Sequence, residues 1–362
     1  DGADGDGEGA ISDNTVLNGA PAVITFSHTH STALQRINPG ATVTLYYRVA
    51  PDQRIAPQQI LTNTVTASYD TLAGSTNESG NQTVDLRPNG DIGGARVYTS
   101  APAAARVQII PLLTYPKEIT RLSNTPLTGV GTTQVVLVGE EIEYRLSADL
   151  PVARLRNFVI QDRLPAGMSC SQAAVVNLNL APYDAAGFTR PDGSLVPQIT
   201  PTCLSDRVIW DFGDVVLTKK PAGASVFRFP VSFIARVDNA AGNNNDTVLS
   251  NGVPATSATL TYVDDGGTSR SLNYNQVDVI VKESRVAITK SFGAVVNADG
   301  GDELTITVTA TNNGTADAYN LRVLDDLVDR NMTFIQGSVS GSGPPDSVDI
   351  TTFGANQPVF VW

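Results

Sequence analysis

The sequence predicts an all-β protein built from tandem β-sandwich repeats that are incomplete at both ends. One observation is a series of short runs in which Val, Ile, Thr and Tyr alternate with other residues, as at 41–49, 226–234 and 303–310. The other is the turn chemistry between these runs, where Gly, Pro, Asn and Asp cluster. The 31 Gly and 21 Pro of the chain suit many turns between short strands, which is typical of sandwiches.

The composition limits the class of protein. Hydrophobic residues make up 41% and charged residues 17% of the 362 residues, which indicates a folded chain of two to four domains. No run of apolar residues reaches the length of about 18 needed to span a membrane. The formal net charge of −12 disfavours binding to nucleic acid or to an anionic membrane surface.

Internal repeats define the domain organisation. Residues 158–168 match residues 321–332, and the C-terminal residues 358–362 match residues 207–210. The matches recur at a spacing of roughly 165–190 residues, which is the size of one sandwich with variable loops.

A second set of matches aligns four polar residues in two pairs. Asn63 aligns with Asn251, because each follows a Leu two positions earlier in a similar strand. Lys117 aligns with Lys290, and these are two of only five lysines in the chain.

The repeat phase predicts three segments. Residues 111–282 form one complete repeat with an insertion near 170–205, residues 1–110 resemble the later half of a repeat, and residues 283–362 resemble the earlier half. Half a sandwich cannot bury its own core, so each half needs a partner. Two explanations stay open: the chain is a window cut from a longer array, or the halves of neighbouring copies complete each other head to tail.

At residues 306–327, 142–167 and 61–67 the chain resembles the conserved immunoglobulin-like repeat of large bacterial surface and adhesin proteins. That family is related to fimbrial backbone domains that form isopeptide bonds. The resemblance implies an extracellular, cell-surface structural segment of a fibre or stalk, which self-assembles with copies of itself or with adjacent repeats. Two alternatives are an adhesin module that binds carbohydrate or protein and an accessory repeat region of a large secreted enzyme.

Similarity to the fimbrial domains also implies a self-crosslink in the complete repeat. The expected participants are Lys117 on the first strand, Asn251 on a late strand and the acid Glu141 between them, with Glu140 as the alternative acid. A desolvated lysine becomes a nucleophile, and a buried protonated acid polarises the amide. Otherwise, Lys117 is a solvated surface lysine and Asn251 is a turn residue.

The two cysteines of the chain, Cys170 and Cys203, flank the insertion. We expect them to close it as a disulfide, which would indicate an oxidising compartment. The alternative is two unrelated free thiols.

A calcium site is the one cofactor expectation. Carboxylates alternate with glycines at the N-terminus, and the expected ligands are Asp1, Asp4, Asp6 and Glu8. Weaker versions of this pattern occur at 264–265 and 299–302, and a solvated acidic turn is the alternative.

The sequence predicts no enzyme. It contains no G-x-S-x-G, P-loop or H-E-x-x-H motif. The only two histidines, His28 and His30, lie two residues apart, so they share a face of a strand and either form a surface pair or reach one metal ion.

Overall fold

The structure is a computed structural model, and it describes residues 24–26, 32–70, 97–128, 133–252, 257–293, 297–325, 332, 334–335, 338–340, 347–349 and 359–361. The chain divides into two compact units, Asp1–Asp52 and Gln53–Trp362. The domain boundaries expected near residues 110 and 282 stay predictions.

The first unit contains one short 3-10 helix among its described residues, η1 (Thr32–Leu34). Residues 41–49, which the alternating pattern predicts as a strand, are irregular. Side chains of both alternating sets are exposed there, with Tyr46 at 89% and Val49 at 76%. The prediction of a strand here was wrong, because alternation produces a strand only where a neighbouring strand pairs with the backbone.

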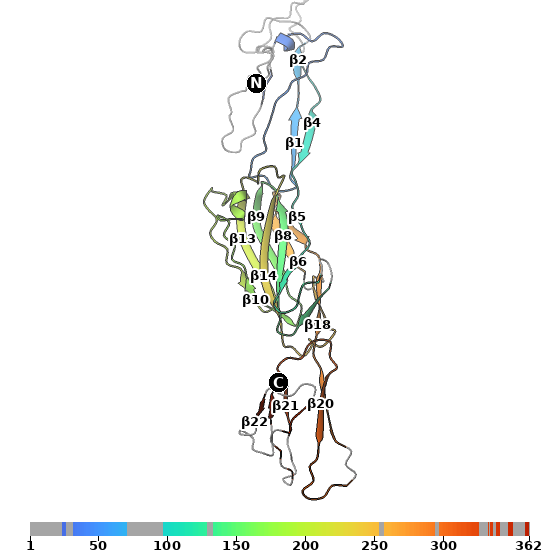
Figure 1. The fold of residues 1–362 in the computed structure, drawn as a ribbon. Coiled ribbons are helices and arrows are strands. Elements are labelled where there is room, and N and C mark those ends of the chain that lie inside the picture. Colours follow the sequence, from blue (N-terminus) through green and yellow to red (C-terminus); the bar gives the residue numbers. More distant parts are fainter. Residues whose placement is uncertain are drawn as a thin grey trace, which may run out of the picture. The chain divides into compact units, whose positions relative to one another are not determined.

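The described part of residues 113–282 forms three sheets (Figure 1). The first sheet has the order β10–β14–β8–β5, and β6 also pairs with β8. The second sheet has the order β11–β13–β9–β16–β17, and β12 also pairs with β13. The third sheet has the order β15–β18–β7. The bounds in the first sheet are β5 Leu113–Thr114, β6 Glu118–Leu122, β8 Glu141–Leu150, β10 Met168–Ala173 and β14 Phe227–Val237. Those in the second are β9 Arg154–Arg163, β11 Phe188–Thr189, β12 Thr202–Cys203, β13 Arg207–Leu217, β16 Thr259–Val263 and β17 Ser269–Asn273. Those in the third are β7 Gln134–Leu137, β15 Val248–Asn251 and β18 Val277–Lys282.

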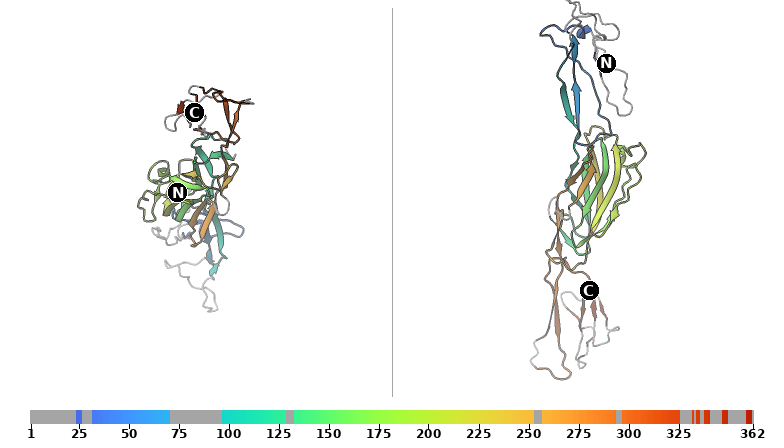
Figure 2. Two further views of the ribbon diagram at one scale, coloured as in Figure 1. Left: turned by 90° about the horizontal axis from the view of Figure 1, so that it is seen from below. Right: turned by 180° about the vertical axis from the view of Figure 1, so that it is seen from behind.

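Period-2 alternation produces the core of this sandwich. In β14 the burial alternates strictly along the strand, so that Phe227, Phe229, Val231 and Phe233 are buried while Arg228 between them is exposed. Such alternation is expected of a strand with one face against the core and one toward water. The strands lie in layers in the views of Figures 1 and 2.

Aromatic rings fill the space between the two larger sheets. Phe158 of β9 stacks on Phe212 of β13 with ring centroids 4.9 Å apart, and both rings contact Phe229 of β14. Trp210 is fully buried, and its indole N–H donates to the carbonyl of Ala174 at 2.9 Å. Truncating one such ring to alanine costs about 3–5 kcal/mol in a typical core.

The insertion predicted near 170–205 runs from β10 to β13. It carries the 3-10 helix η2 (Tyr183–Ala186) and the short strands β11 and β12. Its apolar side chains Val176, Leu178 and Val196 are buried in the same core cluster, so the insertion is part of the sandwich.

A nested pair of hairpins occurs twice in the chain. β15 pairs with β18 and β16 pairs with β17; in the same way, β1 pairs with β4 and β2 pairs with β3. The bounds of the second set are β1 Ile60–Val65, β2 Ser68–Asp70, β3 Val97–Thr99 and β4 Ala103–Gln108. This correspondence agrees with the sequence match of Asn63 with Asn251.

The remaining strands form two small sheets. β19 pairs with β20, and β23 lies between β21 and β22. Their bounds are β19 Val286–Phe292, β20 Ile306–Asn312, β21 Arg322–Leu324, β22 Ser347–Asp349 and β23 Val359–Val361.

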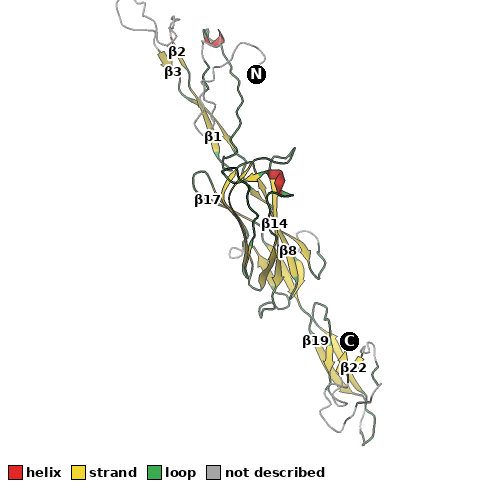
Figure 3. Ribbon diagram, turned by 90° about the vertical axis from the view of Figure 1, so that its left-hand side faces the viewer, coloured by secondary structure: helices red, strands yellow, loops and turns green. Residues whose placement is uncertain are grey.

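The predicted all-β sandwich class is confirmed. Strands account for nearly all regular structure in the described residues, and the helical pieces are only two short 3-10 turns (Figure 3). None of the helices described has the length and apolar character required to span a bilayer.

Candidate functional site

Three polar side chains meet inside the sandwich. Lys117 directly precedes β6, Asp162 lies near the end of β9 and Asn251 is the last residue of β15. Lys117 is 3% exposed, and both other residues are fully buried. Buried polar groups of this kind require partners, because burial without them costs several kcal/mol.

Asp162 holds the group together. Lys117 Nζ lies 3.2 Å from Asp162 Oδ2 and 3.4 Å from Asp162 Oδ1. Asn251 Nδ2 donates to the same Oδ2 at 3.4 Å. The lysine and the asparagine therefore share one carboxylate, and we call these three residues the buried triad.

Local structure explains why each member points inward. Phe158, Ile160 and Asp162 are alternate residues of β9, and all three are fully buried. Asn251 follows the buried Leu249 by two residues on β15 in the same way.

Lys117 is held at its backbone and along its side chain. Its backbone N–H donates to Asn275 Oδ1. Its Nζ lies 5.8 Å from the ring centroid of Tyr144, which is fully buried in β8. These contacts fix the amino group of Lys117 within the core.

The electrostatics of the buried triad favour neutral forms. Burial lowers the pKa of Lys117 below its ordinary value, although the charge of Asp162 acts in the opposite direction. Burial likewise raises the pKa of Asp162 to about 6, against the effects of Lys117 and Asn251. A free amine next to a protonated carboxyl is the form that low dielectric favours.

Two tyrosines line the same region. Burial raises the pKa of the Tyr274 hydroxyl well above its ordinary value, and the charge of Asp162 adds to this effect. The pKa of the Tyr144 hydroxyl is raised for the same two reasons. Both hydroxyls therefore stay protonated at neutral pH and do not act as bases here.

The arrangement has the components of amide exchange. A neutral Lys117 is a nucleophile, Asn251 carries an electrophilic side-chain carbonyl, and a protonated Asp162 can donate to that carbonyl. Asn251 Oδ1 is buried and has no hydrogen-bond partner among the described residues. A rotation of the amide by half a turn exchanges Nδ2 for Oδ1 opposite Asp162.

The expected acid, Glu141, does not lie with Lys117 and Asn251, so this prediction was wrong; the carboxyl that contacts both residues is that of Asp162. On β8 the residues Ile142 and Tyr144 face the core, so Glu141 points to the other side. Its carboxylate accepts a hydrogen bond from Ser171 Oγ at 2.9 Å.

The alternative acid, Glu140, is fully buried but has another role. Its Oε1 accepts from the backbone N–H groups of Asn124 and Thr125 at 2.9 and 2.7 Å and from Thr125 Oγ1 at 2.9 Å. Its Oε2 accepts from the backbone N–H of Leu137 at 2.9 Å. Glu140 thus ties two loops to the start of β8.

The matched lysine of the C-terminal segment has an acid of its own. Lys290 Nζ lies 2.6 Å from Asp325 Oδ1, and Asp325 is the residue that matches Asp162 in the repeat. Asn63, the match of Asn251, lies in β1.

Cys170 and Cys203 are joined in the structure. Their sulfur atoms lie 1.97 Å apart, and the bond links β10 to β12 across a separation of 33 residues. It therefore closes the insertion, as the positions of the two cysteines predict.

The expected calcium ligands Asp1, Asp4, Asp6 and Glu8 lie outside the described residues, as do His28 and His30. In the weaker pattern at 264–265, Asp264 pairs with Arg270 and accepts from the backbone N–H of Thr268. The described residues contain no group of three or more His, Cys, Asp or Glu side chains suited to a metal ion.

No family model and no curated protein matches the sequence. Among solved structures, the chain is similar to the major pilin subunit BcpA of Bacillus cereus, with 10% identity over 60% of this chain and 65% of the pilin and a TM-score of 0.29. The match thus spans less than two thirds of that pilin chain.

Two further similarities are of the same order. The full-length major pilin SpaD from Corynebacterium diphtheriae gives 13% identity over 72% of this chain and 82% of the pilin, with a TM-score of 0.24. The collagen adhesin CNA from S. aureus gives 10% identity over 61% of this chain and 59% of the adhesin, with a TM-score of 0.21. The functional argument therefore rests on the buried triad.

Proposed function

We propose that this chain is a structural segment of an extracellular surface fibre or stalk, and that an amide bond between Lys117 and Asn251 locks its complete repeat. The observation that carries the proposal is the burial of Lys117, Asp162 and Asn251 in mutual contact. A lysine and an acid are rarely buried completely unless their pairing has a purpose.

The reaction balances within the chain. The lone pair of neutral Lys117 Nζ attacks Asn251 Cγ, and protonated Asp162 donates to the developing oxyanion on Oδ1. Asp162 then transfers a proton from Nζ to the side-chain nitrogen of Asn251. The bond from Cγ to this nitrogen breaks, ammonia leaves, and a secondary amide joins Nζ to Cγ.

The position of this bond suits a module under tension. Lys117 precedes β6 at the start of the repeat, whereas Asn251 ends β15 near its close. The bond would close a loop that contains β8, β9, β13 and β14, which are the strands that carry most of the core. Pulling on the two ends of the chain would then leave these strands outside the path of the force.

The mass of the intact denatured protein tests the proposal. The wild-type chain should weigh about 17 Da less than its sequence mass, because one ammonia is lost per bond. Asn251→Ala and Lys117→Ala should each show their full sequence mass. A wild-type chain at full sequence mass, in protein shown by circular dichroism to be folded, would contradict the proposal.

A further inference from the structure

The hairpin β19–β20 presents an apolar face with a lysine in it. Alternate residues of β19 share this face with the residues opposite them on β20, and the set comprises Val286, Ile288, Lys290, Phe292, Ile306, Val308, Ala310 and Asn312. The other face consists mainly of Thr and Ser. Ile288 is 49% and Phe292 is 52% exposed, so the apolar face is only partly covered.

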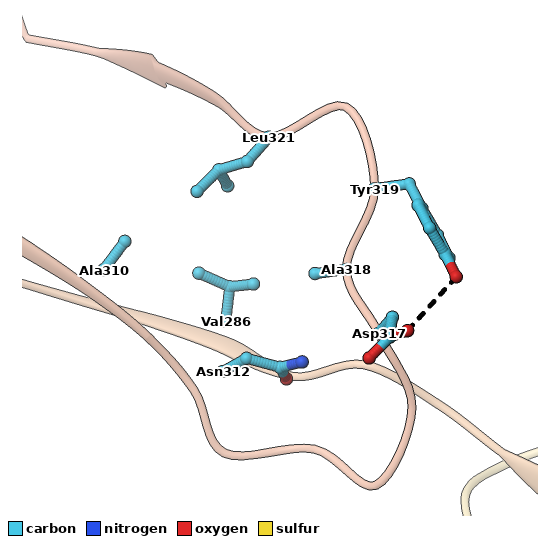
Figure 4. Close-up of a pocket in the computed structure, with 7 residues that line it drawn as sticks. All are labelled: Val286, Ala310, Asn312, Asp317, Ala318, Tyr319 and Leu321. Atoms are coloured by element: carbon cyan, nitrogen blue, oxygen red, sulfur yellow. Dashed lines mark hydrogen bonds between the residues drawn. The ribbon is translucent and has the colours of Figure 1, made fainter. Parts of the chain in front are cut away.

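Figure 4 shows one end of this face. Val286 and Ala310 of the hairpin lie opposite Leu321 across an open pocket, and Ala318 lines its side. Tyr319 beside it donates its hydroxyl to Asp317 at 3.2 Å. The hairpin lines the pocket with Val286 and Ala310 and with one polar residue, Asn312.

The hairpin β1–β4 has an apolar face with an asparagine in it. Leu61, Asn63 and Val65 alternate along β1, and Val107, Ala105 and Ala103 lie opposite them on β4 in that order. Val65 is 62% and Val107 is 57% exposed. A two-stranded hairpin with an exposed apolar face is marginally stable by itself.

The complete repeat shows such a hairpin in its buried state. Leu249 pairs with Val279 and Asn251 pairs with Val277, in the register in which Leu61 pairs with Val107 and Asn63 with Ala105. This face is buried in the sandwich, where the exposure is at most 4% for Leu249, Asn251 and Val279.

The lysine strands also correspond in register. Glu118, which follows Lys117, pairs with Arg145; Ser291, which follows Lys290, pairs with Thr307 at the equivalent position of the repeat. The two lysine–aspartate pairs differ in burial. The side chains of Lys117 and Asp162 have no exposed surface, whereas Lys290 is 40% and Asp325 is 11% exposed.

We propose that the β1–β4 hairpin of a second copy of this chain packs on the β19–β20 face, and that its Asn63 forms an amide bond with Lys290. This inference rests on the chemistry of the proposed function. Asp325 would take the part that Asp162 takes in the complete repeat. The two copies would then share one sandwich, to which one copy contributes the β1–β4 hairpin and the other the β19–β20 hairpin.

Chain order favours a second copy as the partner. In the complete repeat the lysine and the aspartate precede the asparagine along the chain, whereas Asn63 precedes Lys290 and Asp325. Each copy carries both an asparagine hairpin and a lysine hairpin. Such a heterologous contact can be repeated by each further copy, and it generates a filament where the rotation between copies does not close a ring.

The covalent step between copies balances in the same way as the reaction of Lys117 with Asn251. Lys290 Nζ of one copy attacks Cγ of Asn63 in the other, and the bond from Cγ to the side-chain nitrogen breaks. Asp325 transfers the proton from Nζ to that nitrogen, and one ammonia leaves for each junction.

Complementary single variants test this inference. Lys290→Arg retains Asn63, and Asn63→Ala retains Lys290, so neither variant alone should form the bond between two copies. Mixed, they should give a covalent dimer and nothing larger in denaturing electrophoresis under reducing conditions. The wild type should give a ladder at multiples of 38.1 kDa, and Lys282→Arg should give the same ladder as a matched control.

Peptide mapping of the dimer band should find Lys290 joined to Asn63. Monomers alone from the wild type and from the mixture, or a Lys290–Asn63 bond within one chain, would overturn the inference. Lys290 joined to another asparagine would overturn it as well. The Lys117–Asn251 bond is read separately as the mass deficit of Lys290→Arg monomers, so the failure of either bond is distinguished from the failure of the other.

Discussion

Lys117 Nζ lies 3.2 Å from Asp162 Oδ2, and neither side chain has any exposed surface. A buried ion pair by itself contributes little to stability, because desolvation offsets the attraction between the charges. Asn251 binds the same carboxylate oxygen, so the ion pair lies next to an amide with which the lysine can react. Proton transfer within the pair yields the amine and the acid that amide formation requires.

Asp162→Ala should prevent the crosslink, because no other described carboxyl contacts both Lys117 and Asn251. The intact mass should equal the full sequence mass. Relative to Asn251→Ala, which also lacks the bond, Asp162→Ala should lose about 3–5 kcal/mol in urea unfolding, because Lys117 stays buried without its partner. Glu141→Ala serves as the control and should keep the mass deficit.

Glu140→Ala should destabilise the fold without affecting the crosslink. Removing its carboxylate leaves the N–H groups of Asn124, Thr125 and Leu137 without their acceptor. We expect a loss of at least about 4.5 kcal/mol in urea unfolding, since three N–H groups each lose a hydrogen bond worth about 1.5–3 kcal/mol. A missing mass deficit in folded Glu140→Ala would show that Glu140 takes part in the chemistry.

Stability should depend on pH through Asp162 in a chain that lacks the crosslink. The folded-state pKa of about 6 lies above the ordinary value of 3.8, so the native state binds more protons between these values. The contribution of Asp162 to stability is therefore largest below about pH 4, falls by roughly 1.4 kcal/mol per pH unit up to about pH 6, and is then level. The measurement is the free energy of unfolding of Asn251→Ala minus that of Asn251→Ala/Asp162→Asn across this range. A flat difference would contradict the raised pKa.

Removing the disulfide should destabilise the insertion. A loop of 33 residues between Cys170 and Cys203 corresponds to about 3–4 kcal/mol of chain entropy in the unfolded state. Cys170→Ala/Cys203→Ala should show this loss in urea unfolding, and reductant should destabilise the wild type but not the variant. Equal stability of the two proteins without reductant would show that the thiols are not joined.

Sequence reasoning reached two members of the buried triad. The repeat aligned Lys117 with Lys290 and Asn251 with Asn63, and the structure places Lys117 and Asn251 together. The similarity to fimbrial domains implied an acid between Lys117 and Asn251, and the pair 140–141 was expected to supply it. The signal for Asp162 was its alternation with Phe158 and Ile160, which places it on the buried face.

The same limits apply to the fold. Alternation predicts β14 well because its apolar face meets the core, as the buried Phe229 and Phe233 show. It fails at 41–49 because a pattern within one strand does not specify a partner strand. Pairing between distant segments, such as Glu118 with Arg145, depends on tertiary contacts that local sequence does not record.

Single-molecule extension of the chain by its two ends tests the central claim most directly. In reductant, the wild type should unfold without releasing the 134 residues (251 − 117) between Lys117 and Asn251, whereas Asn251→Ala should release them and lengthen by about 450 Å more at roughly 3.4 Å per residue. Without reductant, the fully extended length of Asn251→Ala should be about 110 Å shorter than in reductant, because its disulfide then holds back 33 residues. The extended length of the wild type should not change, because the disulfide lies inside the loop that the amide bond already closes. Equal extension of the two proteins in reductant would contradict the claim that an amide bond locks this repeat.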